Sequence, residues 1–176
     1  MIDEKLHDFR NFLYLVWKHL KLPEPTPIQY SLAHYLATGS QRTIISAFRG
    51  CGKSWITSVY TLWRLLLNPQ LNILVVSASK NRADDFSTFC LRLLSEMEVL
   101  KHFYPKDNQR QSKISFDVAP ALASHQPSVK SLGITSQLTG SRSNLIIADD
   151  VETSSNSQTQ LMRDRLGEAI KEFEAI

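Results

Sequence analysis

A short glycine-containing segment constrains this chain more than any other part of it. Residues 43–54 read Thr-Ile-Ile-Ser-Ala-Phe-Arg-Gly-Cys-Gly-Lys-Ser. The apolar start predicts a strand over residues 43–46, and the part that follows is typical of a phosphate-binding loop. Gly50 and Gly52 have no Cβ, so backbone N–H groups there can approach phosphate oxygens closely. A bound nucleotide is the first inference.

The two residues after the second glycine are those that such a loop needs. Lys53 would direct a positive charge at the β and γ phosphates, and Ser54 would offer a hydroxyl to Mg²⁺. A helix that begins here points the positive end of its dipole at the anion. Ala47 stands where the motif G-x-x-x-x-G-K-[ST] has its first glycine. On the loop alone, an ordinary turn therefore stays open as the alternative.

A second segment supplies acidic residues. Residues 145–150 read Leu-Ile-Ile-Ala-Asp-Asp, which is typical of a buried central strand that delivers carboxylates to the C-terminal edge of a parallel sheet. Asp149 is the predicted Mg²⁺ ligand, Asp150 the candidate for polarising an attacking water, and Glu152 the reserve. The alternative is a strand followed by an acidic helix cap. Together with the loop, however, the segment favours a nucleotide-hydrolysing enzyme.

Length and composition set the limits of the fold. With 176 residues, 43% of them hydrophobic, the chain is expected to form one domain. It contains no run of 18 apolar residues and no charged-then-apolar leader, so neither a membrane span nor a secretion signal is predicted. Cys51 and Cys90 lack the spacing of metal ligands or of a redox pair, which suits a reducing cytoplasm. The net charge of +3 permits a polyanionic partner without demanding one.

Hydrophobic periodicity predicts alternating strands and helices. Helices are expected over residues 5–21, 28–37, 53–67, 83–97 and from about 155 to the end, and strands over 43–46, 71–77, 113–118, 129–134 and 145–150. The strand at 43–46, the helix at 53–67 and the strand at 71–77 should form a right-handed βαβ crossover. The predicted class is α/β with a mostly parallel sheet.

Four segments follow one another in an informative order: Pro25–Gln29, Ala47–Ser54, Leu74–Lys80, and Gly133–Arg142 running into the acidic strand. Together they resemble the terminase large subunit of short-tailed, autographivirus-type phages, and the resemblance covers nearly the whole chain. An arginine four residues before the loop lysine, here Arg49, is a habit of that family. The resemblance implies a three-layer P-loop NTPase fold of the additional-strand, helicase- and terminase-like type. It also implies a motor that hydrolyses ATP to package genomic DNA into an empty capsid.

The resemblance assigns further roles to single residues. Gln29 would read adenine, because an amide both donates and accepts hydrogen bonds, and the alternative is a polar residue at a helix start. Arg49 would be the cis-acting arginine that neutralises charge on the γ-phosphate, and the alternative is a plain surface arginine. Arg142 would act on a neighbouring subunit's nucleotide or on DNA, unless it is a solvated loop cation. The predicted nucleotide-binding residues are Gln29, Arg49, Gly50, Cys51, Gly52, Lys53 and Ser54. The predicted Mg²⁺ ligands are Ser54 and Asp149. The predicted catalytic residues are Asp150, Arg49 and Glu152.

The chain also departs from the family. The family's acidic strand usually closes with Asp-Glu, whereas this one closes with Asp149-Asp150, so either Asp150 or Glu152 is expected to position the water. No second cluster of three acids is present, so no nuclease domain and no DNA cleavage are predicted. The predicted ATPase domain spans residues 1–176, with a helical, adenine-binding lead-in over 1–40 and an incomplete core over 41–176. Because the family inserts a further strand between the acidic strand and the loop strand, the chain is expected to be a fragment of a longer motor protein.

One stretch is a candidate for contact with DNA. Cations and aromatic rings are interleaved between residues 101 and 113, which would suit phosphate contacts and base stacking. The members are Lys101, His102, Phe103, Tyr104, Lys106, Arg110 and Lys113. The alternative is a solvated connection with two buried rings.

The partners follow from the resemblance alone. They are double-stranded DNA, the portal protein and the small terminase subunit. The chain is expected to form a homo-oligomeric ring, a pentamer, on the procapsid in the host cell cytoplasm. No membrane partner is expected. Two other functions stay open. One is a helicase-like P-loop ATPase that acts on nucleic acid without a capsid, and the other is a truncated remnant that binds nucleotide without turning it over.

Overall fold

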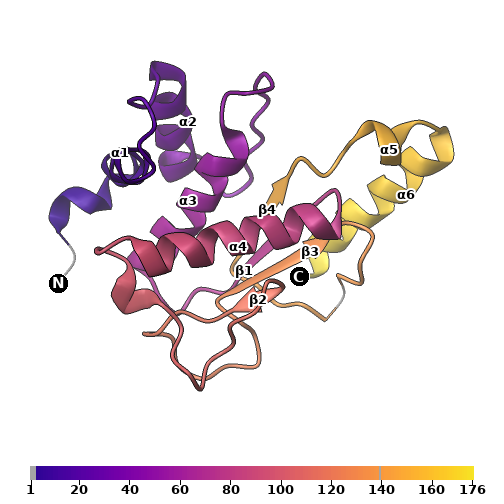
Figure 1. The fold of residues 1–176 in the computed structure, drawn as a ribbon. Coiled ribbons are helices and arrows are strands. Elements are labelled where there is room, and N and C mark those ends of the chain that lie inside the picture. Colours follow the sequence, from indigo (N-terminus) through magenta and orange to yellow (C-terminus); the bar gives the residue numbers. More distant parts are fainter. Residues whose placement is uncertain (1–2, 139) are drawn as a thin grey trace. The chain divides into compact units, whose positions relative to one another are not determined.

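The computed structural model describes residues 3–138 and 140–176 (Figure 1). Its contacts divide the chain into two compact units, one ending at Leu67 and the other beginning at Asn68, and each is described by itself. The first unit contains the predicted phosphate loop, and the second contains the predicted acidic strand. Whether both units serve one ATPase domain over residues 1–176 stays a prediction. Thr139, within the resembling segment 133–142, lies outside the described residues.

The first unit is built from helices around aromatic side chains. The ring centroid of Phe9 lies 5.4 Å from that of Tyr60 and 5.1 Å from that of Trp63. The Trp63 indole N–H donates to the carbonyl oxygen of Leu6 at 2.9 Å, so the buried ring has its polar atom satisfied. The elements are the 3₁₀ turn η1 (Glu4–His7) and the helices α1 (Phe9–His19), α2 (Pro27–Thr38) and α3 (Lys53–Leu67).

Local signals explain where α1 begins and ends. The Asp8 carboxylate accepts a hydrogen bond from the Arg10 backbone N–H at 2.9 Å and caps the helix. This cap separates η1 from α1, so the helix predicted over residues 5–21 is shorter than expected. Lys21 has a φ of 57°, which turns the chain out of the helix before Pro23.

The predicted strand over residues 43–46 is wrong. Residues 43–48 have no regular structure, and the Ile44 side chain is 90% exposed. Every strand among the described residues belongs to the second unit, so this segment has no ladder partner within its own unit. A strand forms only where a neighbour pairs with its N–H and C=O groups. The predicted βαβ crossover from residue 43 to residue 77 is therefore not formed either.

The second unit contains a sheet with strand order β2-β3-β1-β4. The strands are β1 (Ile73–Ser77), β2 (Ser115–Phe116), β3 (Val129–Gly133) and β4 (Leu145–Asp149). Both β3 and β4 run parallel to β1, whereas the short β2 runs antiparallel to β3. The predicted α/β class with a mostly parallel sheet is confirmed.

The acidic strand lies at the edge of this sheet and not at its centre, contrary to the prediction. All five residues of β1 are buried because β1 pairs on both sides. In the part of the chain that the structure describes, β4 pairs only with β1. Its Ala148 side chain is exposed, as expected for an edge strand that is not covered on all sides.

Helices cover both faces of the sheet. Helix α4 (Lys80–Glu96) runs along one face (Figure 1), where the Ser87 hydroxyl hydrogen-bonds the Ser131 hydroxyl of β3. Helix α6 (Gln160–Lys171) covers the opposite face through a buried apolar cluster. The cluster consists of Leu74, Val76, Ile134, Leu138 and Leu166. Alternation of side chains along β1 and β3 therefore produces three layers within this unit.

The remaining elements are short. They are η2 (Lys101–Phe103), α5 (Ser154–Ser157) and η3 (Glu172–Ala175). The single helix predicted from about residue 155 is interrupted, because Thr159 caps a new helix by accepting from the Met162 N–H at 3.3 Å. Among the described residues, no helix combines the length and apolar character that crossing a membrane requires.

Gly133 permits the close packing of α4 onto the end of β3. A Cβ at this position would lie 2.9 Å from the Lys80 backbone nitrogen and 3.1 Å from the Ser79 carbonyl carbon. Backbone atoms cannot move aside as a flexible side chain can, so we expect Gly133→Ala to lower the free energy of unfolding of this unit by about 1–3 kcal/mol.

The matched control is Gly167→Ala in α6, where a Cβ would meet nothing within 4 Å. Alanine stabilises a helix interior relative to glycine by about 0.5–1 kcal/mol, so this variant should be neutral or stabilising. Amide hydrogen exchange in β1 and β3 is the suitable measurement, because all three tryptophans lie in the first unit. Unchanged protection in Gly133→Ala would contradict the packing argument.

Candidate functional site

The predicted phosphate loop has the backbone conformation that its glycines suggest. Helix α3 begins at Lys53, as predicted. Gly50 and Gly52 have φ angles of 90° and 86°, in the left-handed region that other residues rarely adopt. A Cβ at Gly52 would also lie 3.1 Å from Gln29 Nε2. Both glycines are thus favoured by backbone conformation, and a Cβ at Gly52 would in addition require the flexible Gln29 side chain to shift slightly.

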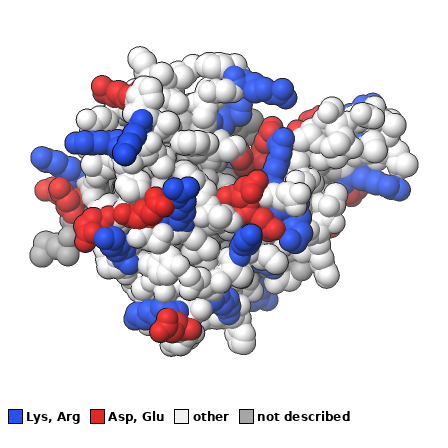
Figure 2. All heavy atoms as spheres, in the orientation of Figure 1, with Lys and Arg blue, Asp and Glu red and all other residues white. Residues whose placement is uncertain are grey.

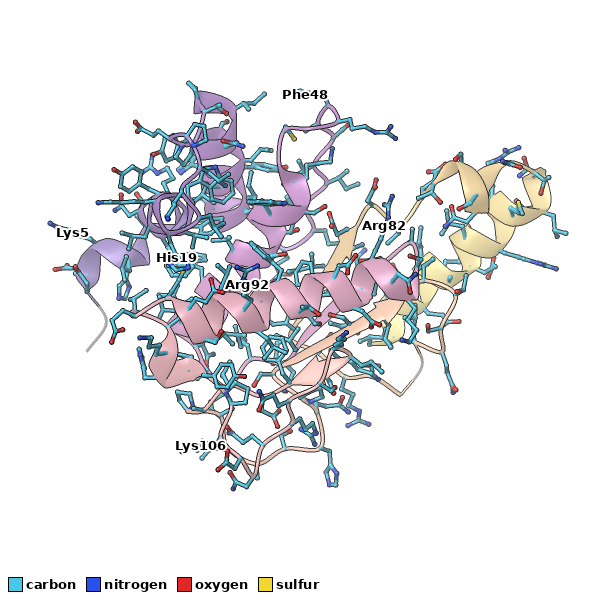
Figure 3. All side chains as sticks on the ribbon, viewed as in Figure 1. Lys5, His19, Phe48, Arg82, Arg92 and Lys106 are labelled. Atoms are coloured by element: carbon cyan, nitrogen blue, oxygen red, sulfur yellow. The ribbon has the colours of Figure 1, made fainter. Side chains whose placement is uncertain are left out.

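The Lys53 side chain lies within the loop. Its ammonium donates to the carbonyl oxygens of Ala47 at 2.6 Å and of Phe48 at 3.2 Å. Two of the three ammonium N–H groups are used in this way, which closes the loop around the positive charge. Arg49 and Ser54 are exposed, and the exposed Phe48 ring lies at the turn of the loop (Figure 3).

Gln29 connects the start of α2 to the loop. Its Oε1 accepts from the Thr26 backbone N–H at 2.9 Å, and its own N–H donates to Thr26 Oγ1 at 3.4 Å. The side-chain Nε2 donates to the Cys51 carbonyl oxygen at 3.0 Å. The contacts therefore include those of a helix-start residue, and the adenine role stays a prediction. The Thr-x-x-Gln spacing is a capping-box signal that the sequence analysis missed.

Tyr30, beside Gln29, does not add negative charge near the helix start. Burial, and then the neighbouring Glu24 carboxylate, raise the pKa of Tyr30 above its usual value. The phenol stays neutral in the physiological range and donates to Glu24 Oε1 at 3.4 Å. Tyr30 therefore contributes no negative charge that would reduce the positive charge of the loop.

The acidic residues lie at the carboxyl edge of the sheet in the second unit. Asp149 ends β4 and is in register with Ser77, the last residue of β1. Parallel neighbours end at the same edge, where α/β proteins bind their ligands. Asp150 follows with a φ of 53°, a conformation that aspartate tolerates better than most residues. The turn after β4 is therefore sharp at the predicted water-polarising residue.

Asp150 forms an ion pair that the sequence analysis missed. A guanidinium N–H of Arg82 donates to Asp150 Oδ2 at 2.6 Å. Arg82 projects from the first turn of α4 (Figure 3), which follows β1 directly. The available signal was topological, because the residues after β1 must share an edge with those after β4 once the two strands pair.

Two other predicted residues take no part in such contacts. Glu152 is exposed between β4 and α5, and Arg142 is exposed before β4. Neither side chain has a hydrogen bond or ion pair with another described residue, and their predicted roles stay predictions.

The stretch from residue 101 to residue 113 matches the DNA prediction only in part. Phe103 is 4% exposed, so its ring packs into the core and does not stack on bases, as the alternative of a connection with buried rings expects for this residue. Two basic side chains of the stretch form ion pairs, Lys101 with Glu98 at 2.6 Å and Arg110 with Asp117 at 3.2 Å. The side chains of His102, Lys106 and Lys113 are exposed. On the face shown in Figure 2, basic and acidic side chains are interspersed.

Mg²⁺ is compatible with the chemistry of the predicted ligands. The Ser54 hydroxyl and the Asp149 carboxylate offer oxygen atoms, which Mg²⁺ prefers. Within residues 3–138 and 140–176, no group of three His, Cys, Asp or Glu side chains is placed to hold a metal.

No family model matches this chain, but it is similar to a known protein. The chain is 51% identical over 170 residues to the "Terminase, large subunit" of Enterobacteria phage T3. The alignment covers 96% of this chain and 29% of that protein, so the chain spans only a part of its relative. The resemblance recognised in the sequence is confirmed: this chain is related to a terminase large subunit along nearly its whole length.

Proposed function

We propose that this chain is the ATPase part of a phage terminase motor, which hydrolyses ATP to move double-stranded genomic DNA into a procapsid. The identity of 51% to a terminase large subunit carries the proposal. The left-handed glycines before α3 and the acidic end of β4 support it. The corresponding fold is a P-loop NTPase of the additional-strand type.

In the first unit, the loop binds the phosphates of ATP. Gly50 and Gly52 admit the anion, and Lys53 exchanges its carbonyl contacts for phosphate oxygens, because a charge-assisted bond to an anion is stronger. The exposed Arg49 neutralises charge that builds on the γ-phosphate. Gln29 holds the loop through Cys51 and uses the remaining capacity of its amide for adenine.

In the second unit, the carboxylates support hydrolysis. Asp149 here and Ser54 in the loop of the first unit would each offer an oxygen to Mg²⁺, and the cation, when bound, would neutralise phosphate charge. Asp150 accepts a proton from water as the water oxygen bonds to the γ-phosphorus. The bond from that phosphorus to the bridging oxygen breaks, and ADP and phosphate leave. Glu152 takes the role of Asp150 if the shorter side chain does not reach.

The proposal includes the partners of a packaging motor. These are double-stranded DNA, the portal protein, the small terminase subunit and further copies of the chain in a pentameric ring, acting on the procapsid in the host cytoplasm. Among the described residues of the 101–113 stretch, the exposed basic residues Lys106 and Lys113, with the exposed His102 as a hydrogen-bond donor, are the better candidates for phosphate contact.

Asp149→Ala tests the proposal by separating binding from chemistry. We expect the variant to bind a fluorescent ATP analogue within about threefold of the parent and to lose Mg²⁺-dependent turnover by about a hundredfold or more, because the phosphate contacts persist without the metal ligand. Binding is measured by titration, and turnover by phosphate release with and without double-stranded DNA.

Asp107→Ala is the matched control, because Asp107 is an exposed acid in a loop of the same unit. It should behave like the parent in both assays. If the parent chain neither binds nor hydrolyses ATP, or if Asp149→Ala turns over at the parent rate, the proposed function does not hold.

A further inference from the structure

We infer that Arg82 is a positioning residue, whose ion pair orients the Asp150 carboxylate toward the attacking water. The inference rests on the proposed function, in which Asp150 accepts the proton of that water. It adds a residue of α4 to the activation of water, which otherwise involves only residues that follow β4. The observation behind it is the bond of 2.6 Å between Arg82 and Asp150 Oδ2.

The pair arises from the topology of the second unit. β1 and β4 are parallel neighbours whose last residues, Ser77 and Asp149, are in register. The chain leaves β1 and enters α4 after two residues, with Ser79 as the N-cap accepting from the Arg82 N–H at 3.4 Å. Arg82 is thus fixed in the first turn of a helix packed on the sheet, and its guanidinium meets a residue 68 positions further along the chain.

Asp150 is a side chain that needs such an anchor. Its side chain is 55% exposed, so without a partner the carboxylate could rotate among several orientations in water. Aspartate is one methylene shorter than the glutamate usual at this position of the resembling family, so its reach depends more strongly on orientation. Arg82 bonds Oδ2, which leaves Oδ1 for a water molecule.

The same exposure argues against a mainly stabilising role. The Arg82 side chain is 53% exposed, and exposed ion pairs contribute little to folding stability. Removing the guanidinium should therefore change how Asp150 is held and leave the fold intact. This difference makes the inference testable.

The experiment compares Arg82→Gln with Arg92→Gln in the full chain. Arg92 lies further along α4 (Figure 3) and forms its own exposed pair with Glu96 at 2.6 Å, so it controls for loss of a surface ion pair on the same helix. We expect Arg82→Gln to lower kcat by about tenfold to a hundredfold with KM within about twofold, because misplacing a catalytic group affects the transition state more than substrate binding. Arg92→Gln should leave kcat, KM and the melting temperature at the parent values.

Two further measurements identify the route of the effect. Arg82→Lys keeps a cation but not the planar fork, so its loss in kcat should be smaller than that of Arg82→Gln. In NMR spectra of the nucleotide-free chain, the Arg82 guanidinium signals should change in Asp150→Asn and stay unchanged in Glu152→Gln. Signals that respond to Glu152→Gln and not to Asp150→Asn would overturn the inference.

Failure of the inference is distinct from failure of the proposed function. If the parent hydrolyses ATP and Arg82→Gln matches it, or raises KM with kcat intact, the proposed ATPase stands and the positioning role is wrong. If the parent shows no binding and no turnover, the proposed function fails and the inference falls with it.

Discussion

Lys53→Ala should lower the affinity for Mg²⁺-ATP by at least about tenfold to a hundredfold, because hydrogen bonds to charged groups contribute about 1.5–3 kcal/mol. The Lys53 ammonium is held within the loop by the carbonyl oxygens of Ala47 and Phe48, so its positive charge lies where the loop would bind phosphate. Titration with a fluorescent ATP analogue measures the effect. Lys18→Ala is the control, because Lys18 is an exposed lysine of the same unit.

A second variant separates the two functions of this lysine. In Lys53→Gln, the side chain keeps N–H donors for a carbonyl oxygen of the loop but carries no charge. If Lys53 serves as the cation for the phosphates, Lys53→Gln should bind as poorly as Lys53→Ala. Parent-like affinity in Lys53→Gln would mean that the lysine only closes the loop, and the phosphate-site assignment would be wrong.

Asp150→Asn should lower kcat by about a hundredfold to ten-thousandfold, as expected for loss of a general base, while ATP stays bound. Asparagine has nearly the same shape, tolerates the left-handed φ of 53° at this position and retains an oxygen that can accept from Arg82. The substitution therefore removes the basic group with little change in structure. Phosphate release and nucleotide retention on the same preparation give the two readouts.

Glu152→Gln is the matched comparison for the choice of carboxylate. Glu152 is exposed and unanchored among the described residues, so this variant should keep kcat within about twofold of the parent. If Glu152→Gln stalls turnover and Asp150→Asn does not, the two roles must be exchanged. If both variants hydrolyse ATP at the parent rate, neither carboxylate activates the water.

The sequence by itself determined the features that depend on neighbouring residues. The start of α3 at Lys53, the stripe of apolar residues on α1 and the positions of β1, β3 and β4 all follow from periodicity and from local signals. The local motif also indicated that Gly50 and Gly52 belong to a loop that needs glycine, and both residues have positive φ. These features involve residues a few positions apart, whose preferences act before any long-range contact forms.

Other features depend on which segments meet, and only the tertiary structure decided them. An apolar run cannot indicate whether a partner strand exists, so residues 43–46 were predicted as a strand and form none, and β4 lies at an edge and not at the centre. For Phe103 the sequence left base stacking and burial open, and the fold places the ring in the core.

Contacts within the candidate site also join residues that are far apart in the sequence and so could not be predicted from it. Gln29 meets Cys51 across 22 positions, and Arg82 meets Asp150 across 68. Each pair is set by the packing of helices and by the register of parallel strands, which a single sequence does not display. The types of residue that the chemistry requires were therefore visible in the sequence, whereas the side chains that hold them in place were selected by the fold.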